Sequence, residues 1–86
     1  MYKIVFKKSA AKEFLAIPSK YQEDIEEQLT ILSIWRTDLL DIKILRPKEE
    51  KRYRLRVGKY RVIYKLEKEE LIISVIKIWA RWDVYK

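Results

Sequence analysis

Residues 53–64 have the sequence YRLRVGKYRVIY, which consists of two alternating runs separated by the pair Gly58-Lys59. Alternation with a period of two predicts two strands, each with one buried face. Gly58 can adopt the positive φ that a tight turn between antiparallel strands requires. The stretch therefore predicts a β-hairpin. Arg54 and Arg56 lie on one side of its first strand, and the tyrosines are expected to pack in the core on the other side.

The segments on either side of this hairpin supply the remaining elements. Residues 2–7 alternate like a strand, and a short helix is expected from Ser9 to the residue before Pro18. A second helix is expected over 19–35, and the apolar run 71–79 predicts a strand that is buried on both faces. Neither a helical nor a strand period is clear over residues 37–50.

The second helix begins with a recognisable signal. Ser19 and Gln22 have the spacing of a capping box, with Ser19 as the N-cap. Apolar residues then recur at helical spacing, and the acidic residues take the other side, which we expect to be solvent-exposed. These acidic residues are Glu23, Asp24, Glu26 and Glu27.

This element order predicts an α+β fold. The expected architecture is a two-layer β-α-α-β-β-β domain, with two N-terminal helices packed on one face of a largely antiparallel, twisted sheet. The 86 residues form a single domain over 1–86.

The composition excludes several kinds of chemistry. The chain has no cysteine and no histidine, which removes disulfides, thiolate metal sites and every nucleophile–histidine pair. Catalysis would have to come from Arg, Lys, Tyr, Asp, Glu or Ser, and we expect neither a metal nor a cofactor. No apolar run approaches the roughly 18 residues of a membrane span, so a cytoplasmic protein without a membrane partner is expected.

The charge is concentrated in the second half of the chain. The net charge is +7, but residues 1–42 carry six basic and seven acidic groups, whereas residues 43–86 carry fourteen basic and six acidic groups. This asymmetry indicates a polyanionic partner, with nucleic acid favoured over an acidic protein. The alternative is a solvated surface that serves only solubility.

The hairpin concentrates this charge further. Six basic residues and no acidic one lie between Lys51 and Arg61. The strand rise places Arg54 and Arg56 about 7 Å apart on one face, and Arg61 can join them from the partner strand. Guanidinium groups match phosphate oxygens bidentately, so this cluster favours a phosphate site.

These residues resemble a known group of proteins. The hairpin is similar to the Tyr-Arg-x-Arg-x-Gly-x-Tyr-Arg-x-x-Tyr pattern of the RelE/ParE toxin superfamily, and residues 75–85 (VIKIWARWDVY) resemble its last strand and Arg…Val-Tyr terminus. The resemblance covers the whole chain, and it favours a RelE-like mRNA interferase of a type II toxin–antitoxin system.

The resemblance implies a ribosome-dependent, metal-independent endoribonuclease that cleaves mRNA in the A site. The 2′-OH of the RNA attacks the adjacent phosphate, and translation stops. Matched residue by residue, the implied catalytic set is Arg54, Arg56, Arg61, Arg81 and Tyr85.

Physical chemistry suggests roles within this set. Arginine is a poor base, so Tyr85 is the expected general base, with Arg61 and Arg54 stabilising the phosphate. Arg81 and Arg56 would position the phosphate or assist the leaving group. Many family members have a lysine at one of the two positions that Arg54 and Arg56 occupy here, and this chain does not. Lys59 or Lys77 could replace it as the base. Further RNA contacts are expected from Lys51, Arg52, Lys59, Lys77 and Trp82.

Two other expectations complete the prediction. Trp79 is expected in the core, whereas Trp82 could equally stack on a base or be a core or antitoxin-facing residue. The expected partners are the ribosome with mRNA, and a cognate antitoxin with an acidic or amphipathic segment that orders on binding. The alternatives are a ParE-like toxin that inhibits DNA gyrase and a non-enzymatic nucleic-acid-binding module.

Overall fold

Five strands and two helices make up the described part of the chain. The structure is a computed structural model that describes residues 1–46 and 51–80. Its elements, in chain order, are β1 (Lys3–Phe6), α1 (Lys8–Leu15), α2 (Ser19–Ser33), the 3₁₀ turn η1 (Thr37–Leu39), β2 (Asp41–Arg46), β3 (Arg52–Val57), β4 (Tyr60–Glu67) and β5 (Ile72–Ala80). Each predicted element is present, within one or two residues at most ends.

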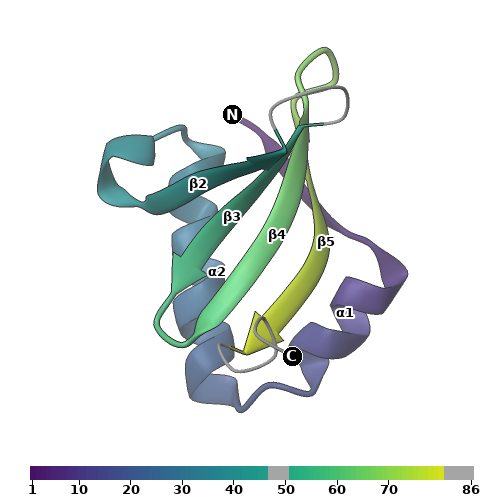
Figure 1. Cartoon of the computed structure of the whole chain (residues 1–86), viewed down its shortest axis with the longest axis vertical. Coiled ribbons are helices and arrows are strands. Elements are labelled where there is room, and N and C mark those ends of the chain that lie inside the picture. Colours follow the sequence, from purple (N-terminus) through teal and green to yellow (C-terminus); the bar gives the residue numbers. More distant parts are fainter. Residues whose placement is uncertain (47–50, 81–86) are drawn as a thin grey trace.

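The strands form one sheet with the order β1-β5-β4-β3-β2. β1 pairs with β5 in parallel, and the other three pairings are antiparallel. The sheet is strongly twisted, and α2 crosses behind it while α1 lies beside β5 (Figure 1). The predicted two-layer α+β fold is therefore confirmed. The apolar run of β5 is explained by its place between β1 and β4.

The segment without a clear period contains an additional strand. β2 lies at the edge of the sheet beside β3, and its register shifts between Ile44 and Arg46. Ile42 is half-buried, whereas Ile44 and Leu45 are both exposed. An edge strand with an irregular register does not require strict alternation, which is why the sequence pattern did not reveal it.

The core lies between α2 and one face of the sheet. The helix contributes Ile25, Leu29 and Leu32, and the hairpin contributes the side chains that alternate with its arginines. Tyr64 is 2% exposed, and its ring stacks on the ring of Tyr53 at 5.3 Å between centroids. The expectation that the hairpin tyrosines pack in the core is confirmed.

The predicted capping box at the start of α2 is wrong. Pro18 is the N-cap, and no side chain caps the helix. The side-chain amide of Gln22 instead donates to the carbonyl oxygens of Phe14 (3.0 Å) and Ile17 (2.9 Å). Carbonyls in the last turn of a helix and just after it have no intrahelical donor, so Gln22 supplies one to the carbonyl of Phe14, in the last turn of α1, and one to that of Ile17, which follows the helix. The acidic side chains of α2 are exposed, as expected.

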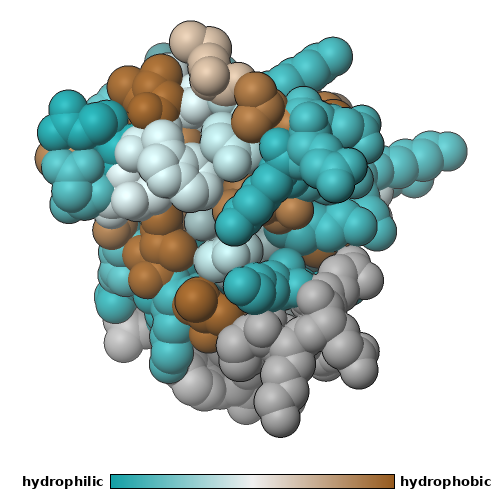
Figure 2. Space-filling model, turned by 90° about the horizontal axis from the view of Figure 1, so that it is seen from above, coloured by the Kyte–Doolittle hydropathy of each residue, from teal (hydrophilic) through white to brown (hydrophobic). Residues whose placement is uncertain are grey.

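Several large apolar side chains remain on the surface. Ile34, Trp35 and Leu39 follow α2, and Ile44 and Leu45 lie on β2; all are more than 40% exposed. Figure 2 looks onto the upper end of the molecule and shows apolar side chains separated by projecting hydrophilic ones. Within the described residues, no helix is long and apolar enough to span a bilayer.

Candidate nucleic-acid interface

The strand register places the predicted arginines on one face of the sheet. Arg56 on β3 is directly opposite Arg61 on β4, which in turn is opposite Trp79 on β5. In the next row Arg54 faces Ile63, and Ile63 faces Lys77. Side chains of directly opposed residues share a face. This set, Arg54, Arg56, Arg61, Lys77 and Trp79, is called the arginine face below.

The arginine face points away from α2. The residues that alternate with it, such as Leu55 and Val62, are fully buried in the core beneath the helix. One hairpin therefore supplies both layers, and residues 53–64 carry the core on one side and the arginines on the other. The predicted convergence of the three hairpin arginines on one face is confirmed.

Arg61 is buried although it is charged. It is only 8% exposed, because β4 is the middle strand and large side chains flank it on both neighbours. Its Nη1 has no hydrogen-bond partner among the described residues, and the same holds for the buried Nε of Arg54. Buried N–H donors of cationic groups are costly to leave unsatisfied. Each of these two orphaned donors would therefore be stabilised by an acceptor such as an anion.

Arg54 is held from one side by an acidic residue. Its Nη2 donates to Oδ1 of Asp41 on β2 at 2.8 Å, and the Arg54 side chain is 18% exposed while that of Asp41 is 55% exposed. This contact fixes one end of the guanidinium and leaves Nε without a protein acceptor in the part of the chain described. Arg56 is exposed. The arginine face therefore has a buried part at Arg61 and an accessible part at Arg56.

Lys77 and Trp79 differ from their expected roles. Lys77 forms an ion pair with Glu13 of α1 (Nζ–Oε2, 3.1 Å), so its ammonium is engaged within the protein. Trp79 is only partly buried and stands opposite Arg61 on the arginine face. The expectation that Trp79 packs in the core is wrong. Trp79 is two residues after Lys77 on β5, so both side chains lie on the same face, and Ile78 between them points into the core.

The other predicted RNA contacts are spread around the hairpin. Arg52 continues the row of Arg54 and Arg56 along β3 and is half-buried. The ammonium of Lys59 lies 4.7 Å from the centroid of the Tyr21 ring, on the helix side of the sheet. Lys51 is exposed at the opposite end of β3. These three residues do not join the arginine face at Arg61.

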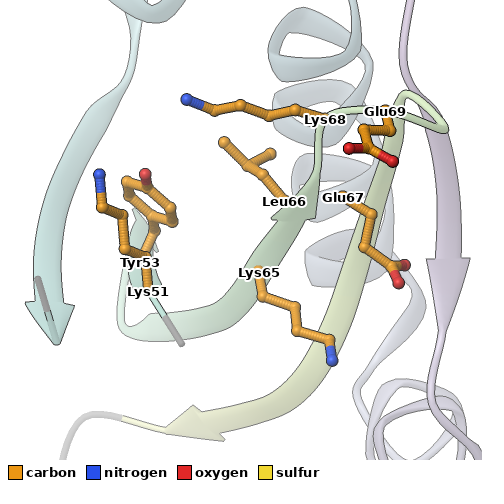
Figure 3. Close-up of a pocket in the computed structure, with 7 residues that line it drawn as sticks. All are labelled: Lys51, Tyr53, Lys65, Leu66, Glu67, Lys68 and Glu69. Carbon is orange, nitrogen blue, oxygen red and sulfur yellow. The ribbon is translucent and has the colours of Figure 1, made fainter. Parts of the chain in front are cut away.

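A pocket of about 440 Å³ lies beside Lys51. Figure 3 shows Tyr53 and Leu66 in this pocket with the side chains of Lys51 and Lys68 beside them, whereas the side chains of Lys65 and Glu67 point away. Its lining residues are Lys51, Tyr53, Lys65, Leu66, Glu67, Lys68 and Glu69. It carries both signs of charge and does not contain Arg54 or Arg61, so it is separate from the orphaned donors.

Three predicted residues lie outside the described part of the chain: Arg81, Trp82 and Tyr85. Among the described tyrosines, burial and then the neighbouring Tyr53 raise the pKa of Tyr64 well above its ordinary value. Tyr64 is therefore not suited to be a general base. Residues 1–46 and 51–80 contain no cluster of three acidic side chains that could hold a metal.

Comparison with known proteins agrees with this geometry. The model of the family described as "ParE toxin of type II toxin-antitoxin system, parDE" matches residues 4–85. The chain belongs to this toxin family. A RelE-like fold places it in the wider RelE/ParE superfamily. Comparison with curated protein sequences gives no match.

Several of the solved structures that resemble this toxin contain RelE proteins. The RelE of the archaeal RelE–RelB complex from Pyrococcus horikoshii is 25% identical, with a TM-score of 0.78 over 93% of this chain and 94% of that one. The isolated Escherichia coli RelE toxin is 26% identical, with a TM-score of 0.70 over 99% and 92%. The toxin of the Methanococcus jannaschii RelB–RelE complex is 22% identical, with a TM-score of 0.75 over 95% of both chains, and supports the fold alone.

Proposed function

We propose that this toxin is an endoribonuclease that binds a scissile phosphate between Arg54 and Arg61. The observation that carries the proposal is the pair of buried, unpartnered N–H donors, Nε of Arg54 and Nη1 of Arg61. A phosphate in this position would accept from both groups and remove the cost of their burial. A purely solubilising surface gives no reason to bury a guanidinium to 8% exposure.

The same donors suit the transition state of RNA cleavage. When the 2′-OH attacks the adjacent phosphate, negative charge accumulates on the non-bridging oxygens of a pentacoordinate phosphorus. Guanidinium groups fixed in a buried site stabilise that charge because they need no reorganisation. Arg61 and Arg54 take this role in the proposal, and the exposed Arg56 positions the neighbouring phosphate.

The proton transfers are assigned to the end of the chain. Tyr85 is proposed as the general base for the 2′-OH, because a positive charge close to a tyrosine favours its ionised form and Arg81 is four residues away in the sequence. Arg81 then positions the phosphate or assists the departing 5′-oxygen. The substrate is proposed to be mRNA in the ribosomal A site, which supplies an extended strand with an accessible 2′-OH.

The test is an mRNA cleavage assay on programmed ribosomes with the purified toxin. The proposal predicts cleavage at the A-site codon with a 2′,3′-cyclic phosphate on the upstream product. The Tyr85→Phe variant is expected to cleave far more slowly while binding the ribosome with similar affinity. Absence of cleavage by the wild-type toxin, or equal rates for both proteins, contradicts the proposal or the assignment of Tyr85 respectively.

A cognate antitoxin is the proposed protein partner. The similar RelE proteins from P. horikoshii and M. jannaschii are found in complexes with RelB. An acidic segment of the antitoxin would complement the charge of the basic hairpin. An amphipathic segment would cover the exposed apolar residues Leu39, Ile44 and Leu45. Co-expression with the acidic protein from a neighbouring gene, followed by size-exclusion chromatography, tests this association.

Inhibition of DNA gyrase is the second candidate, because the matching family model is that of ParE toxins. It uses the same fold without RNA chemistry. A supercoiling assay with purified gyrase separates the two: a toxin that blocks supercoiling and leaves mRNA intact supports gyrase as the target. A protein that binds RNA but is inactive in both assays would be a non-enzymatic binding module.

A further inference from the structure

Glu13 of α1 makes two contacts with β5, each through a different carboxylate oxygen. Its Oε1 accepts from the backbone N–H of Ile78 at 3.0 Å, and its Oε2 accepts from Nζ of Lys77 at 3.1 Å. The residues are 64 and 65 positions apart in the sequence. A carboxylate held at both oxygens has a fixed orientation, so the two elements are fixed relative to one another.

This contact lies where β5 has lost its outer neighbour. β1 ends at Phe6, which pairs with Val75, so within the described residues no strand covers the outer edge of β5 beyond that point. The register between β4 and β5 also shifts there, between Ile63 and Tyr64. Such an irregularity increases the local twist and changes the direction of the side chains that follow. The last part of β5 is therefore held on one side by its pairing with β4, and on the other side by contacts from outside the sheet.

Glu13 supplies such a contact because α1 is anchored elsewhere. Ala10 is fully buried in the core, and Phe14 packs against Phe6 with 5.3 Å between ring centroids. These apolar contacts fix the helix and bring Glu13, on the adjacent helix surface, to the edge of β5. The carboxylate then satisfies a backbone donor that a sheet edge would otherwise leave to solvent.

The fixed segment belongs to the arginine face. Lys77 lies on that face in the row of Arg54, and Trp79, the next residue on the same side, is directly opposite the buried Arg61. The Lys77 ammonium is 5.7 Å from the Trp79 ring centroid. Arg81 follows two residues later in the sequence. A displacement at Ile78 would therefore also move Lys77 and Trp79, on the β5 side of the proposed phosphate site.

We propose that Glu13 is a positioning residue for RNA cleavage, which holds Lys77 and Ile78 so that the end of β5 stands in register beside Arg61. The proposal rests on the nuclease function proposed above. Glu13 itself does not touch the RNA. Its effect is on the alignment of the reacting groups, to which rates are sensitive because a shift of about 1 Å can cost roughly 100-fold.

Three variants test this role in the ribosome-programmed cleavage assay. Glu13→Ala removes both contacts, and Glu13→Gln keeps an oxygen acceptor for Ile78 while removing the charge that Lys77 pairs with. Glu23→Gln is the matched control, because Glu23 is an exposed residue on α2 and the change in charge is the same. Thermal unfolding of each variant sets an assay temperature at which all of them are folded.

For Glu13→Ala we expect kcat to fall by about tenfold or more, with KM within about threefold of wild type. The kcat of Glu13→Gln is expected to lie between those of Glu13→Ala and wild type. The kcat of Glu23→Gln is expected to stay within twofold of wild type. Amide hydrogen exchange at Ile78 is expected to accelerate in Glu13→Ala while core amides keep their protection.

Two results overturn the proposal. If kcat of folded Glu13→Ala stays within twofold of wild type, Glu13 only stabilises the fold. If KM rises and kcat is unchanged, it acts in RNA binding. A wild-type toxin that does not cleave at all is a different outcome, which removes the proposed nuclease function and with it the reaction that Glu13 would position.

Discussion

The two faces of the β3–β4 hairpin use the same strands for opposite purposes. On the core face, Leu55 and Val62 are fully buried beneath α2, and the tyrosine rings stack on one another. On the arginine face, Arg61 is nearly as buried, yet one of its donors has no acceptor among the described residues. The core face is thus complete within the protein, whereas the arginine face keeps a buried donor that no described residue satisfies.

This difference shows how a chain of 86 residues can carry both a hydrophobic core and a candidate phosphate site on the same two strands. A strand points alternate side chains to opposite faces, so a residue on one face can change with little effect on the other. The rigid core face holds the backbone of the arginine face in place. Substitutions on the two faces are therefore expected to separate stability from activity.

The largest effect is expected at Arg61. Arg61→Ala removes a donor to the transition-state charge and is expected to lower kcat by about 10²–10³-fold. Arg61→Lys is expected to restore only part of this, because an ammonium lacks the planar fork. The melting temperature is expected to stay the same or rise, since a buried guanidinium is lost whose Nη1 has no acceptor among the described residues. Near-normal cleavage by Arg61→Ala would remove the arginine face as the site.

On the core face, Leu55→Ala is expected to cost about 2–5 kcal/mol of stability. Leu55 is 0% exposed and lies between Arg54 and Arg56 along β3. Urea unfolding measures the loss, and cleavage assayed well below the melting temperature is expected to remain within a few-fold of wild type. A collapse of activity in the folded variant would show that the faces are coupled.

Tyr64 makes the core face sensitive to alkali. Its pKa is raised by burial and by Tyr53, so the folded state holds this proton more tightly than the unfolded state, where the pKa is about 10. The corresponding stability is fully present below about pH 10 and is lost as the pH rises beyond it. When the pH is raised from roughly 9 to 11, a window around the ordinary tyrosine pKa, the Tyr64→Phe variant is expected to lose less stability than wild type. Parallel losses in thermal unfolding would contradict this.

The smallest effect is expected at the exposed partner of Arg54. Asp41→Asn removes a carboxylate that competes with phosphate for the guanidinium, so KM is expected to fall by about two- to fourfold, in keeping with the worth of an exposed ion pair. Stability is expected to change by less than about 1 kcal/mol. A higher KM would mean that Asp41 orients Arg54 for binding.

Much of this arrangement could be predicted from local pattern. The period of two over residues 53–64 predicted the hairpin, its buried tyrosines and the shared face of its arginines, because parity along a strand is fixed by backbone geometry. The same geometry places Trp79 on the side of Lys77, but a large aromatic residue at the end of an apolar run also fits a core position, so the pattern alone favours the wrong face. The strand at Asp41–Arg46 was missed because its alternation is irregular.

The sequence by itself determined which residues share a face, and it predicted an anionic partner for an arginine-rich strand pair, since both inferences follow from neighbouring residues. Only the tertiary structure decided that Arg61 is buried in the middle strand, that Asp41 holds Arg54, and that Glu13 reaches Ile78 and Lys77. These contacts join segments far apart in the chain. Which carboxylate meets which cation depends on how helices and strands pack, and no local period records that.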